Sequence, residues 1–294
     1  MKTSCALSCA LALAGLAPLA AADTITDTLE GLVPGPLPQS IWEDMSTRVA
    51  GHTVLPTANV ISTLDAAGAE TLAIQTGGSF GKSAGFHTPV RRASFHDLTA
   101  DVRVDTFGDG AAWGMCVGFT TDDGAADINQ SPQGLVYPWH DGTWHLFVTT
   151  PNGGDFLIQT PQIVLGNWYT IRLQVNTDTG FFNILITDTA TGAIMGGGSI
   201  TFPGFVDDYD SLSFFDGESD GTGTVSSATT IDNISYVSQG LRCPADLSGD
   251  GVVNGSDLAV LLAAWGTPDA DLTGDGIADG SDLAVLLAAW GSCD

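Results

Sequence analysis

Short runs of alternating apolar and polar residues fill the middle of the chain, from about residue 71 to residue 237. In the run 169–176 apolar residues occupy every second position, and the runs 100–105 and 115–119 repeat the pattern. A period of two predicts strands with one buried face. Turn-forming residues separate the runs, at 141–142, 152–153, 178–180 and 190–192. Such turns favour antiparallel hairpins. We therefore expect a mainly β fold, a two-sheet jelly-roll sandwich over residues 49–237.

The end of the chain has a helical period instead. The sequence Gly-Ser-Asp-Leu-Ala-Val-Leu-Leu-Ala-Ala-Trp-Gly occurs twice, over 255–266 and 280–291. In both copies apolar residues recur at i, i+3, i+4 and i+7, which is one face of a helix. They are Leu258, Leu261, Leu262, Trp265, Leu283, Leu286, Leu287 and Trp290. We expect two short helices that pack through these faces, with both Trp side chains in a small core and a Gly ending each helix, at Gly266 and Gly291.

A loop rich in oxygen donors precedes each helix. Numbered from Asp246 and Asp271, donors fall at positions 1, 3, 5, 9 and 12, while position 7 offers a backbone carbonyl and position 6 is Gly. The predicted ligands are Asp246, Ser248, Asp250, Val252, Asn254, Asp257, Asp271, Thr273, Asp275, Ile277, Asp279 and Asp282. Because calcium takes six to eight oxygens, this spacing predicts two calcium ions, and magnesium fits less well. Without metal the carboxylates repel one another, so folding of this segment should depend on calcium.

The duplicated loop and helix, with Asp at position 12 of each loop, resembles a type I dockerin module over residues 243–294. That resemblance implies a small all-α, calcium-binding module that docks onto a cohesin-like or other scaffold or surface protein. It also implies that positions 10 and 11 of each loop help to determine which partner the module binds. These are Gly255, Ser256, Gly280 and Ser281. The shared Gly-Ser pair suggests docking in two orientations. The alternative is a C-terminal segment that calcium stabilises (a calcium-stapled terminus) and that binds no partner.

The first residues of the chain have the features of a secretion signal. Lys2 precedes an apolar run over 6–19 and the small residues 20–22, the pattern of a cleaved signal peptide over residues 1–22. We therefore expect a secreted protein, extracellular or associated with the cell surface, and no membrane insertion. An extended lead-in follows over residues 23–48, and a linker over residues 238–242 joins the sandwich to the dockerin-like segment.

Charge and cysteine content narrow the partners further. The chain has 34 acidic and 8 basic residues, a formal net charge of −26. Nucleic acid and anionic membranes would repel such a surface. Cys243 and Cys293 bracket the C-terminal segment, so we expect a disulfide between them, which export permits. Cys116 then remains, and we interpret it as a buried thiol.

The segment 137–145 is the best glycan-binding candidate in the sandwich. Aromatic rings at a hairpin rim stack on sugar faces, and the carboxylate and imidazole groups hydrogen-bond hydroxyls. The candidates are Tyr137, Trp139, His140, Asp141, Trp144 and His145. In the alternative, the two Trp residues cover the end of the sandwich. The runs 168–173, 182–186 and 230–236 resemble concanavalin A-like or laminin-G-like sandwiches. That resemblance implies sugar or protein binding, or glycan cleavage.

Catalysis is the less favoured interpretation. The paired carboxylates of a retaining glycosidase on this fold are absent, because no two Glu residues lie close enough in the sequence. A lyase needs a His and Tyr pair, which Tyr137 with His140 or His145 could supply. Three hypotheses follow: an anchored glycan- or surface-binding protein, an anchored polysaccharide hydrolase or lyase, and a structural surface protein in which the sandwich is a spacer.

Overall fold

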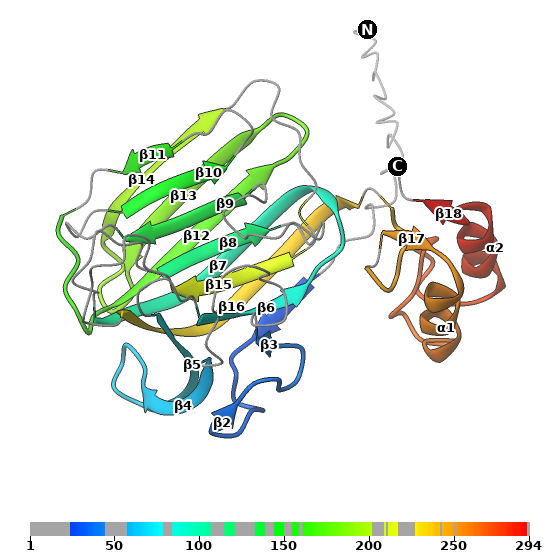
Figure 1. Ribbon diagram of the computed structural model, residues 1–294. Coiled ribbons are helices and arrows are strands. Elements are labelled where there is room, and N and C mark those ends of the chain that lie inside the picture. Colours follow the sequence, from blue (N-terminus) through cyan, green and yellow to red (C-terminus); the bar gives the residue numbers. More distant parts are fainter. Residues whose placement is uncertain are drawn as a thin grey trace, which may run out of the picture.

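The computed structural model describes residues 24–44, 58–78, 84–106, 115–120, 133–138, 144–149, 155–158, 161–201, 209, 211–216, 227–241, 243–249 and 251–292. Two β-sheets face each other, and a small module with two helices lies beside one end of them (Figure 1). Every strand pair in the described part of the chain is antiparallel. The protein is therefore mainly a β-sandwich, as the alternation predicts.

Nine strands form the first sheet, in the order β14-β13-β12-β7-β16-β5-β4-β2, and β1 also pairs with β16. Their bounds are β1 Thr24–Asp27, β2 Gly35–Pro36, β4 Asn59–Leu64, β5 Glu70–Gly78, β7 Ala93–Thr106, β12 Trp168–Asn176, β13 Phe181–Asp188, β14 Ile194–Thr201 and β16 Ser227–Leu241. The predicted turns 178–180 and 190–192 join β12 to β13 and β13 to β14. Strand β16 continues through 238–241, where the sequence predicted a linker.

Seven strands form the second sheet, in the order β11-β10-β9-β8-β15-β6-β3. Their bounds are β3 Glu43–Asp44, β6 Ala84–Pro89, β8 Met115–Thr120, β9 Gln133–Pro138, β10 Trp144–Thr149, β11 Asp155–Ile158 and β15 Ser211–Asp216. The turns predicted at 141–142 and 152–153 lie outside the described residues, but the strands on either side of each turn are paired.

The core lies between the two sheets, on the face that the alternation predicts. Tyr169, Ile171, Leu173 and Val175 on β12 are all buried. The register sets Ile171 opposite Ala100 of β7, which is also buried. Side chains from both sheets join this one hydrophobic cluster. Burying one face of each sheet is what holds a sandwich together.

The predicted lead-in takes part in both sheets. Its strands β1 and β2 join the first sheet, and β3 joins the second. Between them Trp42 is fully buried in the core cluster. Its indole nitrogen donates a hydrogen bond to Asp27 Oδ2 at 2.7 Å. This segment therefore closes the sandwich across the two sheets rather than merely leading into it.

The outer face of the first sheet carries a network of charged and polar side chains. Arg172 donates two hydrogen bonds to Asp97, and Arg103 pairs with Asp105 at 2.7 Å. Within this network Asp232 of β16 is only 2% exposed and lies opposite Asp101 in the register. Burial raises the pKa of Asp232 to about 6, and the nearby carboxylates of Asp101 and Glu30 add to the rise. Hydrogen bonds from the Asn233 N–H and the Thr71 hydroxyl oppose it.

This carboxyl should make the fold less stable as the pH rises. Its folded pKa of about 6 exceeds the ordinary value of 3.8, so the folded state binds the proton more tightly, and stability falls between about pH 4 and pH 6. The full linkage is on the order of 3 kcal/mol. We expect Asp232→Asn to stabilise the protein by about 1–2 kcal/mol at pH 8, after loss of the Thr71 hydrogen bond, and to change little at pH 4. Urea unfolding at both pH values measures this.

Asp269→Asn is the matched control, because Asp269 is exposed and should leave stability unchanged at either pH. Equal stability of Asp232→Asn and the wild type at pH 8 would contradict the assignment.

The C-terminal module contains helices α1, Gly255–Ala263, and α2, Gly280–Ala288, with the short strands β17, Val252–Val253, and β18, Gly291–Ser292. The two helices fall where the period predicts them, but the module also holds a two-stranded sheet and is not purely helical. No helix in the described ranges is long and apolar enough to cross a bilayer.

Candidate functional site

The first carboxylate of each loop organises the turn that follows it. Asp246 accepts hydrogen bonds from Gly249 N at 2.9 Å and Gly251 N at 2.8 Å. Asp271 accepts the equivalent bonds, from Gly274 N at 2.7 Å and Gly276 N at 2.6 Å. All four glycines have positive φ, which glycine adopts without strain. The two loops therefore share one backbone path, as the repeat predicts.

The last carboxylate of each loop ties the loop to its helix. Asp257 accepts from Ser248 N at 2.8 Å and from Asn254 N at 2.7 Å. Asp282 accepts from Leu272 N, Thr273 N and Asp279 N, at 2.8, 2.9 and 2.7 Å. Both carboxylates are fully buried. Each is also the third helical residue of a capping box, so the same side chain ends the loop and starts the helix.

These hydrogen bonds keep the buried carboxylates ionised. Burial raises the pKa of Asp257, but the backbone N–H groups of Asn254 and Ser248 outweigh that effect and hold the pKa below its usual range. The pKa of Asp282 is lowered in the same way, against burial, by the N–H groups of Asp279, Thr273 and Leu272. Each loop therefore holds negative charge at its centre.

No side chain within the module can neutralise that charge. Residues 243–294 contain nine Asp and no Lys, Arg or His. Buried carboxylates need a cation or ample hydrogen bonding, and a loop of oxygen donors with this backbone path suits calcium. The residues present therefore fit the predicted metal, which would be held by the donors at positions 1, 3, 5, 7, 9 and 12 of each loop.

The remaining donors are engaged locally. Asp275 accepts from Ile277 N, and Asn254 and Asp279 cap their helices. Asp250 lies outside the described residues. Among the residues that are described, no three His, Cys, Asp or Glu side chains are gathered closely enough to hold a metal ion. The loop backbone is nevertheless set by the hydrogen bonds of Asp246 and Asp271 to the glycine N–H groups.

The two loops close each other reciprocally. Val253 of the first loop pairs with Gly291, which follows α2. Ala278, at the same position of the second loop, accepts from Gly266 N at 2.9 Å, and Gly266 follows α1. Leu261 and Leu286 pack with Val253 and Ala278 in one small cluster. The repeat therefore forms one interlocked unit, and neither half is complete alone.

The helical faces differ from the prediction. Leu261 and Leu286 are fully buried, but Trp265 is 46% exposed and Trp290 is 50% exposed, so the prediction that both close the core is wrong. The helices end earlier than Gly266 and Gly291, with caps at Ala264 and Ala289. Beyond the caps the chain leaves the helical path, and this carries both Trp side chains out of the core.

Exposed apolar side chains repeat in both halves. Leu262 and Leu287 are 54% and 53% exposed, similar to the two Trp residues. The predicted docking residues are also exposed: Gly255, Ser256, Gly280 and Ser281. We call Leu262, Trp265, Leu287 and Trp290 the Leu/Trp surface. Sequence reasoning assigned these four residues to the core, because a periodic apolar face does not reveal what covers it.

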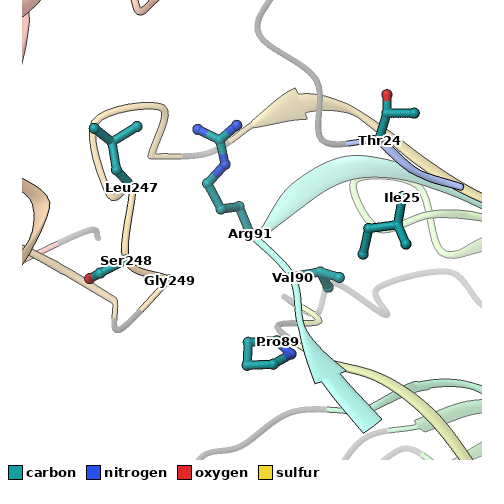
Figure 2. A pocket seen from close by; sticks show the side chains of 8 residues that line it. All are labelled: Thr24, Ile25, Pro89, Val90, Arg91, Leu247, Ser248 and Gly249. Carbon is teal, nitrogen blue, oxygen red and sulfur yellow. The ribbon is translucent and has the colours of Figure 1, made fainter. Parts of the chain in front are cut away.

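The module meets the sandwich through its first loop. Arg91 donates a hydrogen bond from Nη1 to Pro244 O at 3.2 Å. Figure 2 shows Arg91 reaching from the sandwich toward the loop of Leu247. A cavity of about 240 Å³ lies at this junction, and it is lined by Thr24, Ile25, Pro89, Val90, Arg91, Leu247, Ser248 and Gly249. The helices α1 and α2 lie on the side of the module away from the sandwich (Figure 1).

Cys243 is in a disulfide bond. Its predicted partner Cys293 lies outside the described residues, so that pairing stays a prediction. The neighbouring residue Ser292 pairs with Val252 in the module's short sheet.

Three of the six predicted glycan-binding residues lie in the described strands β9 and β10. Trp139, His140 and Asp141 lie outside the described residues. The register sets Tyr137 of β9 opposite His145 of β10, so these two positions share one face of the second sheet.

Trp144 lies opposite Pro138 and therefore belongs to the other face of that sheet. By the same register this is also the face of the buried Val117. The backbone register thus gives Tyr137 and His145 positions on one face of the sheet and Trp144 a position on the other.

No protein-family model and no curated protein matches this sequence. Solved structures with some likeness include a sialidase, with a TM-score of 0.42 and 12% identity over 76% of this chain but only 19% of that chain. Arcelin-5, a lectin-like defence protein from Phaseolus vulgaris, gives 0.41 and 7%, over 74% of this chain and 99% of that chain. The exoplasmic/lumenal domain of VIP36 in a Ca²⁺/Man-bound form gives 0.41 and 8%, over 67% and 83%.

Proposed function

We propose that this protein is a secreted, calcium-binding protein whose sandwich binds glycans and whose C-terminal module attaches it to a scaffold or surface protein. The Leu/Trp surface carries the docking part of the proposal. Exposed large apolar side chains, and aromatic ones above all, are enriched on surfaces that a partner covers. Aromatic anchors such as Trp265 and Trp290 often dominate binding energy.

Calcium supports docking because it holds the loops from which the helices start. The capping boxes at Asp257 and Asp282 connect each loop to the helix that leads into the Leu/Trp surface. When bound, calcium would neutralise the loop carboxylates and order both helices. Partner binding should therefore require calcium, and a cohesin-like protein is the partner class that the loop pattern favours.

The repeat predicts how single and double variants differ. If a partner docks in two orientations, Trp265→Ala or Trp290→Ala alone leaves one orientation intact, and retention of the partner falls only about twofold. The double variant should lose about tenfold or more, because both anchors are gone. Immobilised full-length protein, washed with extracts of the source cells in calcium or in chelator, measures retention of a specific band.

Leu165→Ala is the matched control, because Leu165 is 48% exposed on the sandwich and far from the module in sequence. It should retain the partner fully. A partner that survives the double variant, or that binds equally well in chelator, would argue against docking through this surface. Finding no calcium-dependent partner favours the stapled terminus.

A polysaccharide lyase is the second candidate. The observation that favours it is the cross-strand pair Tyr137 and His145, because a lyase needs such side chains to move a proton. Release of unsaturated sugars from a polysaccharide panel, followed by ultraviolet absorbance, tests it. Activity that disappears in Tyr137→Phe establishes the lyase. Binding to the same polysaccharides without cleavage favours the non-catalytic function, and neither binding nor cleavage favours the spacer.

A further inference from the structure

A groove crosses the outer side of the first sheet at one end. Its walls are the turn between β4 and β5 and the turn between β13 and β14, and its floor is the start of β12 with one residue of β7. Its volume is about 730 Å³, within the range of ligand-binding pockets. The lining residues are Leu64, Asp65, Ala66, Ala67, Gly68, Arg103, Gly166, Asn167, Trp168, Asp188, Ala190 and Thr191.

Hydrogen bonds and a ring contact fix the floor of the groove. The indole nitrogen of Trp168 donates to Leu64 O at 3.0 Å, which fastens the tip of the β4–β5 hairpin over β12. The guanidinium of Arg103 lies 4.9 Å from the Trp168 ring centre and also donates to Thr63 Oγ1 at 3.0 Å. Three other strands separate β4 from β12 in the sheet order, so these contacts bring the hairpin back across the sheet face. The groove is therefore a formed feature of the fold.

Each wall presents a carboxylate that orders its own turn and lines the groove. Asp65 Oδ1 accepts from Ala67 N and Ala69 N, both at 2.8 Å. Asp188 Oδ1 accepts from Thr191 N at 2.8 Å and from Thr191 Oγ1 at 2.7 Å. In both cases Oδ1 orders the turn, and for Asp65 no hydrogen bond reaches Oδ2 from the described part of the chain. The Thr191 hydroxyl and N–H lower the pKa of Asp188, so that this wall stays ionised.

The rest of the lining suits a polyhydroxylated ligand. Asn167 is exposed on the floor, and its side-chain amide makes no hydrogen bond within the described part of the chain, so it can both donate and accept. Ala67 and Ala190 add small apolar patches on opposite walls. Arg103 is paired with Asp105, which leaves the groove with net negative charge from Asp65 and Asp188. Hydroxyl donors fit these acceptors, whereas a carboxylated ligand is repelled.

We propose that this groove is the glycan-binding site, and that it takes an uncharged saccharide whose adjacent hydroxyls donate to Asp65 and Asp188 while Asn167 bonds a third polar group. The proposal rests on the glycan-binding function proposed above and moves its site away from the segment 137–145. The floor has no exposed aromatic platform, since Trp168 is only 7% exposed and lies against Arg103. Recognition therefore depends on hydrogen bonds to the two walls.

The test uses the full-length protein and defined oligosaccharides. The neutral probes are cello-, manno-, xylo- and N-acetylchito-oligosaccharides, the anionic probe is oligogalacturonate, and the cationic probe is deacetylated chito-oligosaccharide. Isothermal titration calorimetry should detect at least one neutral probe and no oligogalacturonate. Ala190→Trp, at an exposed wall position, should fill the groove and weaken that binding by about tenfold or more. Asp65→Asn with Asp188→Asn keeps both turn-forming oxygens and should weaken it by a similar factor.

Ala193→Trp is the matched control, because Ala193 is exposed in the same turn but does not line the groove. It should change the affinity by less than about twofold. Binding of a neutral probe that is unaffected by Ala190→Trp overturns the groove assignment and leaves the glycan-binding function standing. Binding of the cationic probe alone overturns the choice of ligand class. Failure of the wild type to bind any probe overturns both proposals.

Discussion

Replacing Asp282 by Ala should abolish tight calcium binding and destabilise the whole C-terminal module. Asp282 is fully buried and accepts hydrogen bonds from three backbone N–H groups. A hydrogen bond to a charged group contributes about 1.5–3 kcal/mol, so losing these part-buried bonds costs on the order of a few kcal/mol. The substitution also removes a carboxylate from the predicted calcium ligands and breaks the capping box of α2.

The reciprocal closure makes this effect spread to the other half. Gly291 lies beyond α2 and pairs with Val253 of the first loop, so melting of α2 opens that loop as well. Asp257→Ala should act in the same way through Ala278 and Gly266. We therefore expect either variant to bind no calcium tightly, whereas two independent sites would leave one ion bound.

Calcium titration by calorimetry, with far-ultraviolet circular dichroism of the full chain in calcium and in chelator, measures both effects. The wild type should lose helix in chelator, and Asp282→Ala should show that loss even in calcium. Asp269→Ala is the matched control, because Asp269 lies between the two halves, is exposed and is not a predicted ligand. Two ions bound by Asp282→Ala with unchanged helix content would refute the calcium-loop assignment.

Trp42→Ala should destabilise the sandwich by about 3–5 kcal/mol. The ring is fully buried and packs edge-on against Phe86, at a centroid distance of 5.3 Å, and against Phe214, at 6.1 Å. Its indole N–H also satisfies Asp27 Oδ2. Truncation removes the packing between the lead-in and the second sheet and leaves a carboxylate oxygen without that partner.

Urea unfolding followed by tryptophan fluorescence and circular dichroism measures the loss. Trp42→Phe should cost less, because the ring packing is largely kept while the hydrogen bond is lost. Ile41→Ala is the neighbouring control, since Ile41 is 43% exposed and should cost under about 1 kcal/mol. If Trp42→Ala and Ile41→Ala are equally mild, the lead-in does not close the core.

Local pattern predicted the parts of this protein whose physics is local. Alternation at 169–176 identified the buried face of β12, because side chains of a strand point to opposite sides. The spacing of donors after Asp246 and Asp271 predicted the course of both loops, since glycines at set positions determine where the backbone turns. The start of each helix also follows from its own sequence, through the capping boxes at Asn254 and Asp279.

Contacts between distant segments determine the features that the local pattern did not predict. The period of α1 marked Leu261 and Trp265 alike as apolar, but only the neighbouring half of the repeat determines that Leu261 is covered and Trp265 is not. Likewise, the groove exists because Trp168 bonds to Leu64, which is more than one hundred residues earlier in the chain. A sequence pattern identifies which side chains are apolar, whereas the tertiary structure determines which of them are buried. What remains uncovered is therefore visible only once the chain is folded, and here that includes both surfaces proposed to bind.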